Sequence, residues 1–182
     1  MKKFLLLIVI LPLLSTNLHT QTEVVIESFD NWIGGLPEGY EWGSDTLNSA
    51  ISEITGQSGS ALKIIDLNGP IHNGGVLRRN IFFTRTTIPD SLAYYFKGSS
   101  PGIEEGTIGV QFIDGVVTVG TRIISIFSGT NWQRLCGGFE FSGVFDKIEI
   151  RIDVYQNPSY NNEWGGCDEI TLIQHILEGV AS

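Results

Sequence analysis

Residues 147–155 read KIEIRIDVY, and apolar and polar side chains alternate along this stretch without a break. A period of two is typical of a β-strand with one face in a core and the other in water. Similar β-rich runs surround it, separated by turn signals such as Asn73-Gly74-Gly75 and Asp114-Gly115. They cover residues 23–29, 50–55, 60–67, 76–83, 92–97, 107–113, 117–127, 132–141 and 169–174. About ten short strands without an amphipathic helix predict an antiparallel β-sandwich or barrel.

The length and composition fit one all-β domain. The chain has 182 residues, including 22 Gly, and 42% of its residues are hydrophobic. This length supplies one core and not comfortably two, and the hydrophobic content can fill the two inner faces of a sandwich. We therefore expect a single β-sandwich over residues 21–175, followed by a short tail at residues 176–182.

The first 20 residues have the pattern of a secretory signal peptide. Lys2 and Lys3 form a positively charged start, residues 4–14 are almost wholly apolar, and a polar run follows. The apolar run is shorter than the roughly 20 residues that span a bilayer. We predict cleavage near the Thr20–Gln21 bond and a mature protein that is secreted or extracytoplasmic, at the cell surface or in the periplasm.

The charge of the chain narrows the classes of partner. The formal net charge is -9, and removing the leader leaves 9 basic against 20 acidic side chains, a net charge of -11. An acidic surface repels nucleic acid and anionic membranes and favours cations. We therefore expect no nucleic-acid partner and no membrane insertion.

Two cysteines, Cys136 and Cys167, lie in the mature part of the chain. In an oxidising compartment an even pair predicts a disulfide, which would stabilise the fold by about 3–4 kcal/mol through the loop that it closes. The alternative is two buried thiols that pack as small hydrophobic side chains.

Several short motifs resemble those of a known family. Residues 27–32 (ESFDNW) and 36–40 (LPEGY) resemble the opening of bacterial secreted jelly-roll domains of the galactose-binding-like, carbohydrate-binding-module type, and residues 165–172 (GGCDEITL) resemble their closing strand. Residues 58–63 and 131–135 fall where such domains carry similar strand openings. The resemblance implies a jelly-roll sandwich that binds a polysaccharide or oligosaccharide, although this fold serves many roles.

The resemblance also implies a structural Ca²⁺ near the first and last strands. In many relatives the ligands are an acidic residue of the opening segment, an Asp of the closing strand and backbone carbonyls, which here correspond to Glu27 or Asp30 with Asp168. The alternative is that Asp30 and Asp168 are turn residues that accept backbone hydrogen bonds. The chain has no Asp-x-Asp-x-Asp-Gly loop that would favour calcium independently.

The loop at residues 156–164 (QNPSYNNEW) has the chemistry of a sugar-binding site. Sugars stack on flat aromatic rings while nearby amides and acids bond their hydroxyls. We predict Trp164 and Tyr160 as the stacking residues and Asn161 and Asn162 as their hydrogen-bonding partners. The alternative for Trp164 is that it folds back over the sandwich edge and covers the core.

The other aromatic residues are expected to be structural. Trp32, Tyr40 and Trp42 form a cluster in the opening loop that we interpret as packing, and Trp132 begins a strand and is predicted to lie in the core. The outward residues of the 147–155 strand could line a groove for an extended glycan. Such a row is more often a solvated face.

Catalytic patterns are weak in this sequence. Glu149 and Asp153 share a strand face about 13 Å apart, which exceeds both glycosidase geometries, and neither a Gly-x-Ser-x-Gly elbow nor a metal-type spacing of His72 and His175 is present. We therefore favour a secreted, non-catalytic carbohydrate-binding module. The alternatives are a cell-surface domain that binds a cell-envelope protein and a small polysaccharide-degrading enzyme.

Overall fold

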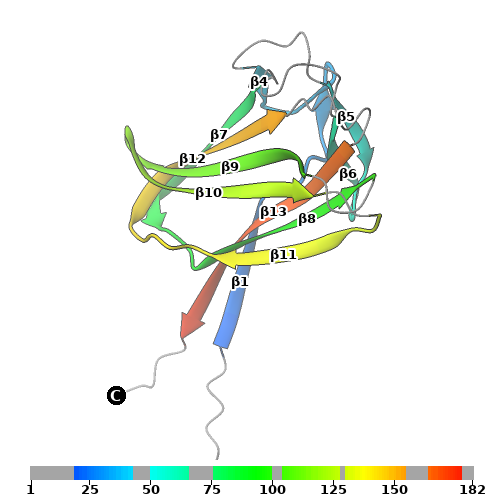
Figure 1. Cartoon of the computed structure of the whole chain (residues 1–182). Helices are drawn as coiled ribbons and strands as arrows, with labels where there is room; N and C mark the ends of the chain where they lie inside the picture. The colour runs from blue at the N-terminus through cyan, green and yellow to red at the C-terminus, as the bar shows by residue number, and fades with distance from the viewer. Residues whose placement is uncertain are drawn as a thin grey trace, which may run out of the picture.

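The computed structural model describes residues 19–42, 50–65, 76–99, 104–127, 130–154 and 164–177, and all regular elements in these ranges are strands. Two antiparallel sheets pack face to face (Figure 1). The predicted antiparallel β-sandwich is therefore confirmed. Within the described ranges, no helix has the length and apolar character that crossing a membrane requires.

The six-stranded sheet has the order β11-β8-β13-β6-β5, with β1 paired to β13. Its strands are β1 (His19–Glu27), β5 (Ala50–Thr55), β6 (Ser60–Ile65), β8 (Ser91–Gly98), β11 (Gln133–Gly138) and β13 (Trp164–Leu177). The five-stranded sheet has the order β10-β9-β12-β7-β4. Its strands are β4 (Glu41–Trp42), β7 (Val76–Thr87), β9 (Glu104–Asp114), β10 (Val117–Phe127) and β12 (Val144–Val154). A two-stranded sheet joins β2 (Trp32–Ile33) and β3 (Leu36–Pro37).

The alternating stretch of the sequence forms β12, at the centre of the five-stranded sheet. Ile148, Ile150 and Ile152 are fully buried in the core between the sheets. Glu149 and Arg151 lie between them in sequence and are only half-buried, because successive side chains of a strand point to opposite faces. The predicted half-buried strand is confirmed.

The strand that closes the domain is longer than the sequence pattern indicates. The predicted run 169–174 lies inside β13, which pairs with β8 on one side and with β6 and then β1 on the other. The segment before residue 169 contains Gly165 and Gly166, which weaken a period-two pattern, and neighbouring strands hold it extended.

The first and last strands form a ribbon that projects beyond the two sheets (Figure 1). Their pairing continues as far as His19 with Leu177. β1 therefore begins before the predicted cleavage bond, and β13 ends at Leu177, after residue 175.

The predicted disulfide is wrong in this structure, and Cys136 and Cys167 are both free thiols. Cys136 lies on β11 and Cys167 on β13, with β8 between these strands. Two strand spacings are about 9.5 Å, whereas bridged Cα atoms lie within about 7 Å. Cys167 is fully buried in the core and Cys136 is exposed, so the alternative of two buried thiols holds for Cys167 alone.

Candidate functional site

Of the four tryptophans, two pack against the core and two lie outside it. Trp32 and Trp42 pack against the core cluster that contains Tyr40, which confirms that the opening aromatic cluster is structural. Trp132 and Trp164 are half-buried and belong neither to that cluster nor to the side chains packed against it. The prediction that Trp132 is a core residue is therefore wrong.

Trp132 and Trp164 lie on the outer face of the six-stranded sheet, around Gly166. The Cys167 side chain points into the core, so the position before it, Gly166, faces outward. Gly166 pairs with Lys63 on β6 and with Lys97 on β8. A Cβ atom on Gly166 would lie 3.4 Å from Trp132 Cη2 and 3.1 Å from Ile54 Cδ1. The glycine thus gives the indole room to approach the strand. We call Trp132, Trp164, Lys63, Lys97 and Ile54 the aromatic face.

Each indole of the aromatic face has an ammonium group over it. Lys63 Nζ lies 4.9 Å from the Trp164 ring centroid, and Lys97 Nζ lies 5.7 Å from that of Trp132. A cation over an indole is stabilised by the ring quadrupole. The arrangement combines flat apolar rings with hydrogen-bond donors, which is the chemistry that a hydroxylated ligand requires.

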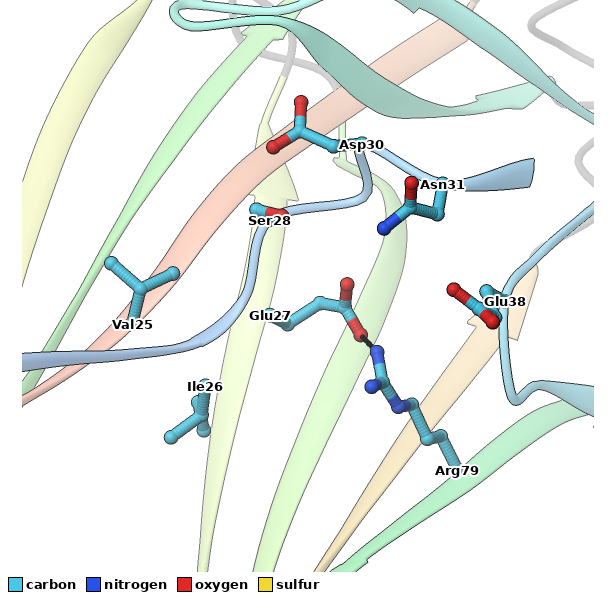
Figure 2. Close-up of a pocket in the computed structure, with 8 residues that line it drawn as sticks. All are labelled: Val25, Ile26, Glu27, Ser28, Asp30, Asn31, Glu38 and Arg79. Carbon is cyan, nitrogen blue, oxygen red and sulfur yellow. Dashed lines mark hydrogen bonds and ion pairs between the residues drawn. The ribbon is translucent and has the colours of Figure 1, made fainter.

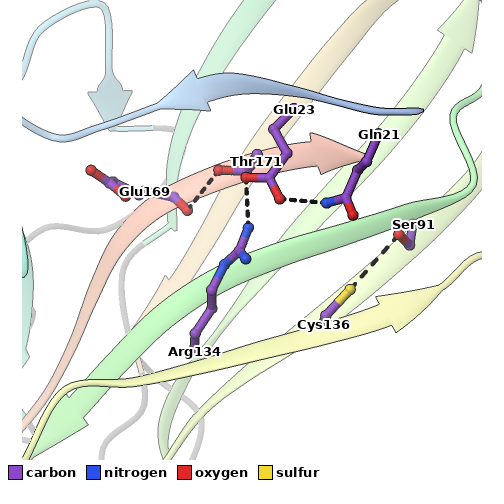
Figure 3. A network of polar contacts seen from close by, with 7 residues as sticks. All are labelled: Gln21, Glu23, Ser91, Arg134, Cys136, Glu169 and Thr171. Carbon is purple, nitrogen blue, oxygen red and sulfur yellow. Dashed lines mark hydrogen bonds and ion pairs between the residues drawn. The ribbon is translucent and has the colours of Figure 1, made fainter. Parts of the chain in front are cut away.

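Further along the same sheet, polar contacts replace the indoles (Figure 3). Arg134 on β11 lies over the Tyr95 ring, with 5.9 Å from its Cζ to the centroid, and its Nη2 is 2.9 Å from Glu23 Oε2. Cys136 Sγ lies 3.7 Å from Ser91 Oγ, a weak contact. These groups connect β11 to β1 and β8 and bound the aromatic face on this side.

Of the four residues predicted to bind carbohydrate, the structure describes Trp164. Tyr160, Asn161 and Asn162 lie outside the described residues. Trp164 begins β13, where its backbone N–H donates to Ser99 Oγ at 2.9 Å and its carbonyl accepts from Ser99 N–H at 2.9 Å. The Trp164 ring is therefore carried by a strand that is fixed at its first residue.

The outer face of the five-stranded sheet, which we call the polar face, contains a recess of about 160 Å³. Neighbouring strands bring its lining residues together through the register of β9 with β10 and β12. The lining residues are Thr107, Gly109, Gln111, Thr121, Ile123 and Arg151. The sequence raised the outward residues of the 147–155 strand as a groove for a glycan but favoured a plain solvated surface. The recess itself could not be predicted, because it depends on the pairing of Gly109 with the neighbouring strands.

The three carboxylates predicted to bind calcium have separate partners. Glu27 is buried, accepts from Phe29 N–H at 2.8 Å and forms an ion pair with Arg79 (Figure 2). Asp30 points away from this pair and accepts from Ser60 N–H at 3.0 Å. Among the described residues, no three His, Cys, Asp or Glu side chains form a group that could hold a metal ion.

Asp168 differs from the other two carboxylates. Its Oδ2 accepts from the N–H groups of Gln57 and Ser58 at 2.7 and 3.2 Å, whereas its Oδ1 is buried without a hydrogen-bond partner. Burial raises the pKa of Asp168 to about 6, and the bonds from Ser58 and Gln57 partly oppose that rise. A buried carboxylate oxygen without a partner is costly unless a proton or a cation satisfies it.

The loop after β5 supplies further oxygens near Asp168. A Cβ on Gly56 would lie 2.5 Å from Asp168 Oδ2 and 2.9 Å from the carbonyl oxygens of both Ser58 and Ser60. Carboxylate and carbonyl oxygens are the donors that Ca²⁺ prefers. The donor set around Asp168 fits calcium in its chemistry, while Glu27 and Asp30 are already engaged.

Solved structures share this fold. The chain is similar to a family 11 carbohydrate-binding module of the cellulosomal cellulase Lic26A-Cel5E of Clostridium thermocellum, with 13% identity and a TM-score of 0.51 over 88% of this chain and 98% of that one. It is also similar to the enzymatically active domain of bacteriophage CBA120 tailspike protein 4, with 9% identity and a TM-score of 0.50 over 76% of this chain but 20% of that one.

A carbohydrate-binding module of family 61, solved with β-1,4-galactotriose, matches 78% of this chain and 92% of its own, with 11% identity and a TM-score of 0.49. No protein-family model and no curated protein matches the chain. At such low identities the likeness concerns the fold. The two matches with TM-scores of 0.50 and 0.51 confirm the predicted jelly-roll sandwich fold.

Proposed function

We propose that this protein is a non-catalytic carbohydrate-binding module that acts outside the cytoplasm, with the aromatic face as its sugar-binding surface. The observation that carries the proposal is the placement of Trp132 and Trp164 outside the core, on either side of Gly166. Burial in the core would be the ordinary use of two large indoles. Their surface position instead offers apolar area to a ligand.

The physical basis of binding is stacking combined with hydrogen bonding. The C–H faces of a sugar pack on the indoles, and the ammonium groups of Lys63 and Lys97 donate to its hydroxyls. Tyr160, Asn161 and Asn162 precede Trp164 in the chain, and we propose that they extend the same site. Removing an aromatic anchor from a binding surface typically costs about 2 kcal/mol, or roughly 30-fold in affinity.

A structural Ca²⁺ beside Asp168 is a separate part of the proposal. Asp168 would hold the ion together with carbonyl oxygens of the loop 56–60, and the ion would fix that loop against β13. The unpartnered Oδ1 atom supports this narrower site. It differs from the predicted set in that Glu27 stays paired with Arg79.

Protein binding and catalysis are the competing functions. Phe82 and Val116 are 78% and 96% exposed and favour a protein interface, and Ile33 is 67% exposed. These residues lie on three separate elements, and singly exposed apolar residues are normal on protein surfaces. The likeness to an enzymatically active phage domain keeps catalysis as an alternative, although a shared fold does not transfer a reaction.

The test is a screen of the mature protein on a glycan array, with Ca²⁺ and with EDTA, followed by affinity measurements for Trp164→Ala and Trp132→Ala. We expect selective binding and at least a tenfold loss in each variant at unchanged secondary structure. Phe82→Ala removes an exposed aromatic ring from the other sheet and serves as the control. Full affinity in both tryptophan variants would exclude the aromatic face, and the absence of any glycan ligand would favour the protein-binding function.

A further inference from the structure

Lys63 and Lys97 lie on either side of Gly166 in the six-stranded sheet. Gly166 pairs with Lys63 on β6 and with Lys97 on β8, so the two lysines belong to one row across the sheet. Their Cα atoms are two strand spacings apart, about 9.5 Å. A lysine carries its ammonium group on a flexible four-carbon stem, and the position between these two has no side chain of its own. Both ammonium groups can therefore reach one ligand group on this face.

Neither lysine has a carboxylate partner among the described residues. The ion pairs of those residues are Arg79–Glu27, Arg85–Asp114 and Arg134–Glu23. The two lysines instead contact the indoles of Trp164 and Trp132, at 4.9 and 5.7 Å from the ring centroids. An ammonium group has three N–H donors, and such a contact with a ring leaves donors for a ligand.

The lack of a carboxylate beside the lysines does not reflect a shortage of acidic side chains. The chain has 20 Asp and Glu residues against 11 Lys and Arg. Lys63 and Lys97 are half-buried, so their charges are less well hydrated than fully exposed ones and gain more from an opposite charge. An anionic group on the ligand can supply that opposite charge.

The acidic residues of the same sheet are engaged elsewhere or lie further away. Asp168 accepts hydrogen bonds from two backbone N–H groups of the loop 56–60. Glu169 lies three residues beyond Gly166, roughly 10 Å along the strand. The other acids of this sheet bind other side chains: Glu23 pairs with Arg134, Glu27 pairs with Arg79, and Glu53 accepts from Ser60 Oγ.

We propose that the ligand of the aromatic face is an acidic sugar, whose carboxylate or sulfate group binds between Lys63 and Lys97. The inference rests on the proposed function, because it uses the same face, and it adds the class of sugar. Ammonium groups bind oxyanions as point charges through charge-assisted hydrogen bonds, so a carboxylate and a sulfate ester suit the same two donors. A neutral sugar offers hydroxyls alone and gains less from these donors.

The net negative charge of the chain does not prevent such binding. At physiological ionic strength, charges are screened beyond about 8 Å. The two ammonium groups that touch the acidic group therefore act on it more strongly than distant carboxylates do. The preference should be clearest for short ligands that contact this face alone, and it should weaken as salt is raised.

The test compares oligosaccharides that differ only in charge. The mature protein is titrated by calorimetry with trigalacturonate and its methyl ester, which test a carboxylate, and with a dextran oligosaccharide with and without sulfate esters. We expect the acidic member of at least one pair to bind at least tenfold more tightly, and this difference to fall below threefold in 1 M NaCl. Equal binding, weaker binding or no binding of the acidic member in both pairs would overturn the inference.

Substitutions at the two lysines locate the charge. Lys63→Gln and Lys97→Gln should each reduce the preference for the acidic member at least fivefold, whereas Lys63→Arg keeps the charge and should retain the preference. Lys147→Gln removes one positive charge from the five-stranded sheet and should change the preference less than twofold. An equal loss in Lys147→Gln would indicate a general charge effect and exclude the two lysines. Melting temperatures show whether each variant is folded.

Trp132→Ala and Trp164→Ala separate this inference from the proposed function. If both variants weaken glycan binding but acidic members bind no better than neutral ones, the inference is wrong and the proposed function stands. If acidic members bind through Lys63 and Lys97 while both tryptophan variants keep full affinity, the anion site stands and stacking on the indoles is wrong. If the lysine variants keep the preference, the acidic group binds elsewhere and the inference is wrong.

Discussion

The outer face of each sheet has a glycine near its centre, and the space above the two glycines differs. At Gly166 an added Cβ would lie 3.1 Å from Ile54 Cδ1 and 3.2 Å from the Leu62 carbonyl oxygen, so the face is filled by neighbouring side chains. At Gly109 the nearest atom would be 3.8 Å away. One glycine admits an indole against its strand, and the other leaves a recess open to a ligand.

The surroundings of the positive charges also differ between the two faces. On the six-stranded sheet Arg134 faces the opposite charge of Glu23, and Lys63 and Lys97 each lie over an indole. On the five-stranded sheet Arg78 faces Arg151, a like charge. Like charges placed directly opposite are destabilising, so the pairing of these two arginines costs stability that the six-stranded sheet avoids.

Gly166→Val is expected to have the largest effect. Its side chain would enter space occupied by Ile54 and Trp132, and overpacking of this kind costs about 2–3 kcal/mol. We expect the melting temperature to fall by roughly 4–12 °C and the fluorescence of Trp132 to change. Gly109→Val is the matched control on the other sheet. An unchanged melting temperature in Gly166→Val would show that the aromatic face is looser than the described contacts indicate.

Gly109→Val is expected to leave the stability of the fold intact. The added side chain enters the recess, where the nearest atom to a Cβ would be 3.8 Å away. Replacing a strand glycine removes a conformational entropy cost, so the melting temperature should stay equal or rise. Thermal unfolding measures the effect. A melting temperature that falls as far as that of Gly166→Val would contradict the open space above Gly109.

The burial of Asp168, two residues after Gly166 on β13, should make the stability of the protein depend on pH. Its folded pKa, about 6, is raised above the ordinary value of 3.8 by burial, so the folded protein holds this proton more tightly than the unfolded chain. The stability that it contributes is complete below pH 3.8 and is lost as the pH rises through 6. Urea unfolding should therefore show a loss on the order of 1 kcal/mol between pH 4 and 7, relative to Asp168→Asn.

Calcium should reverse this loss if Asp168 holds the ion. A bound cation replaces the proton and favours the carboxylate. We expect millimolar CaCl₂ at pH 7 to raise the melting temperature of the unmodified protein and to leave Asp168→Asn unchanged. Equal melting temperatures in CaCl₂ and EDTA would exclude a structural calcium at this position.

The smallest expected effects are those of single surface charges. Arg134→Gln removes an exposed ion pair and should lower the free energy of unfolding by about 0.5 kcal/mol. The change should disappear in 1 M NaCl, where the Debye length is about 3 Å. A loss of the same size in 1 M NaCl would show that the ion pair is not its cause.

Local pattern was enough to predict most strands. The runs at residues 50–55 and 117–127 match β5 and β10 in both bounds, and residues 147–155 match most of β12. Alternation is a local property that a strand shows whatever its neighbours are. The two-residue strands β2, β3 and β4 were missed because they are too short to show a period.

Two predictions that depended on which residues are neighbours in space were wrong. Trp132 was expected in the core because strand aromatics usually are, but its place beside Gly166 follows from the pairing of β13 with its neighbours. Cys136 and Cys167 were expected to bond because two cysteines in a secreted chain often do. Their separation by β8 depends on strand order, which the spacing in sequence does not encode.

The sequence by itself determined the all-β class, the position of most strands and the alternation that buries Ile148, Ile150 and Ile152, because these depend on residues within one strand. Only the tertiary structure decided which side chains share a face. It brought Trp132 to Gly166, Arg78 to Arg151, and Asp168 to the loop 56–60. The physical reason is that register and strand order arise from packing the whole chain, whereas the period of two is present in each segment alone.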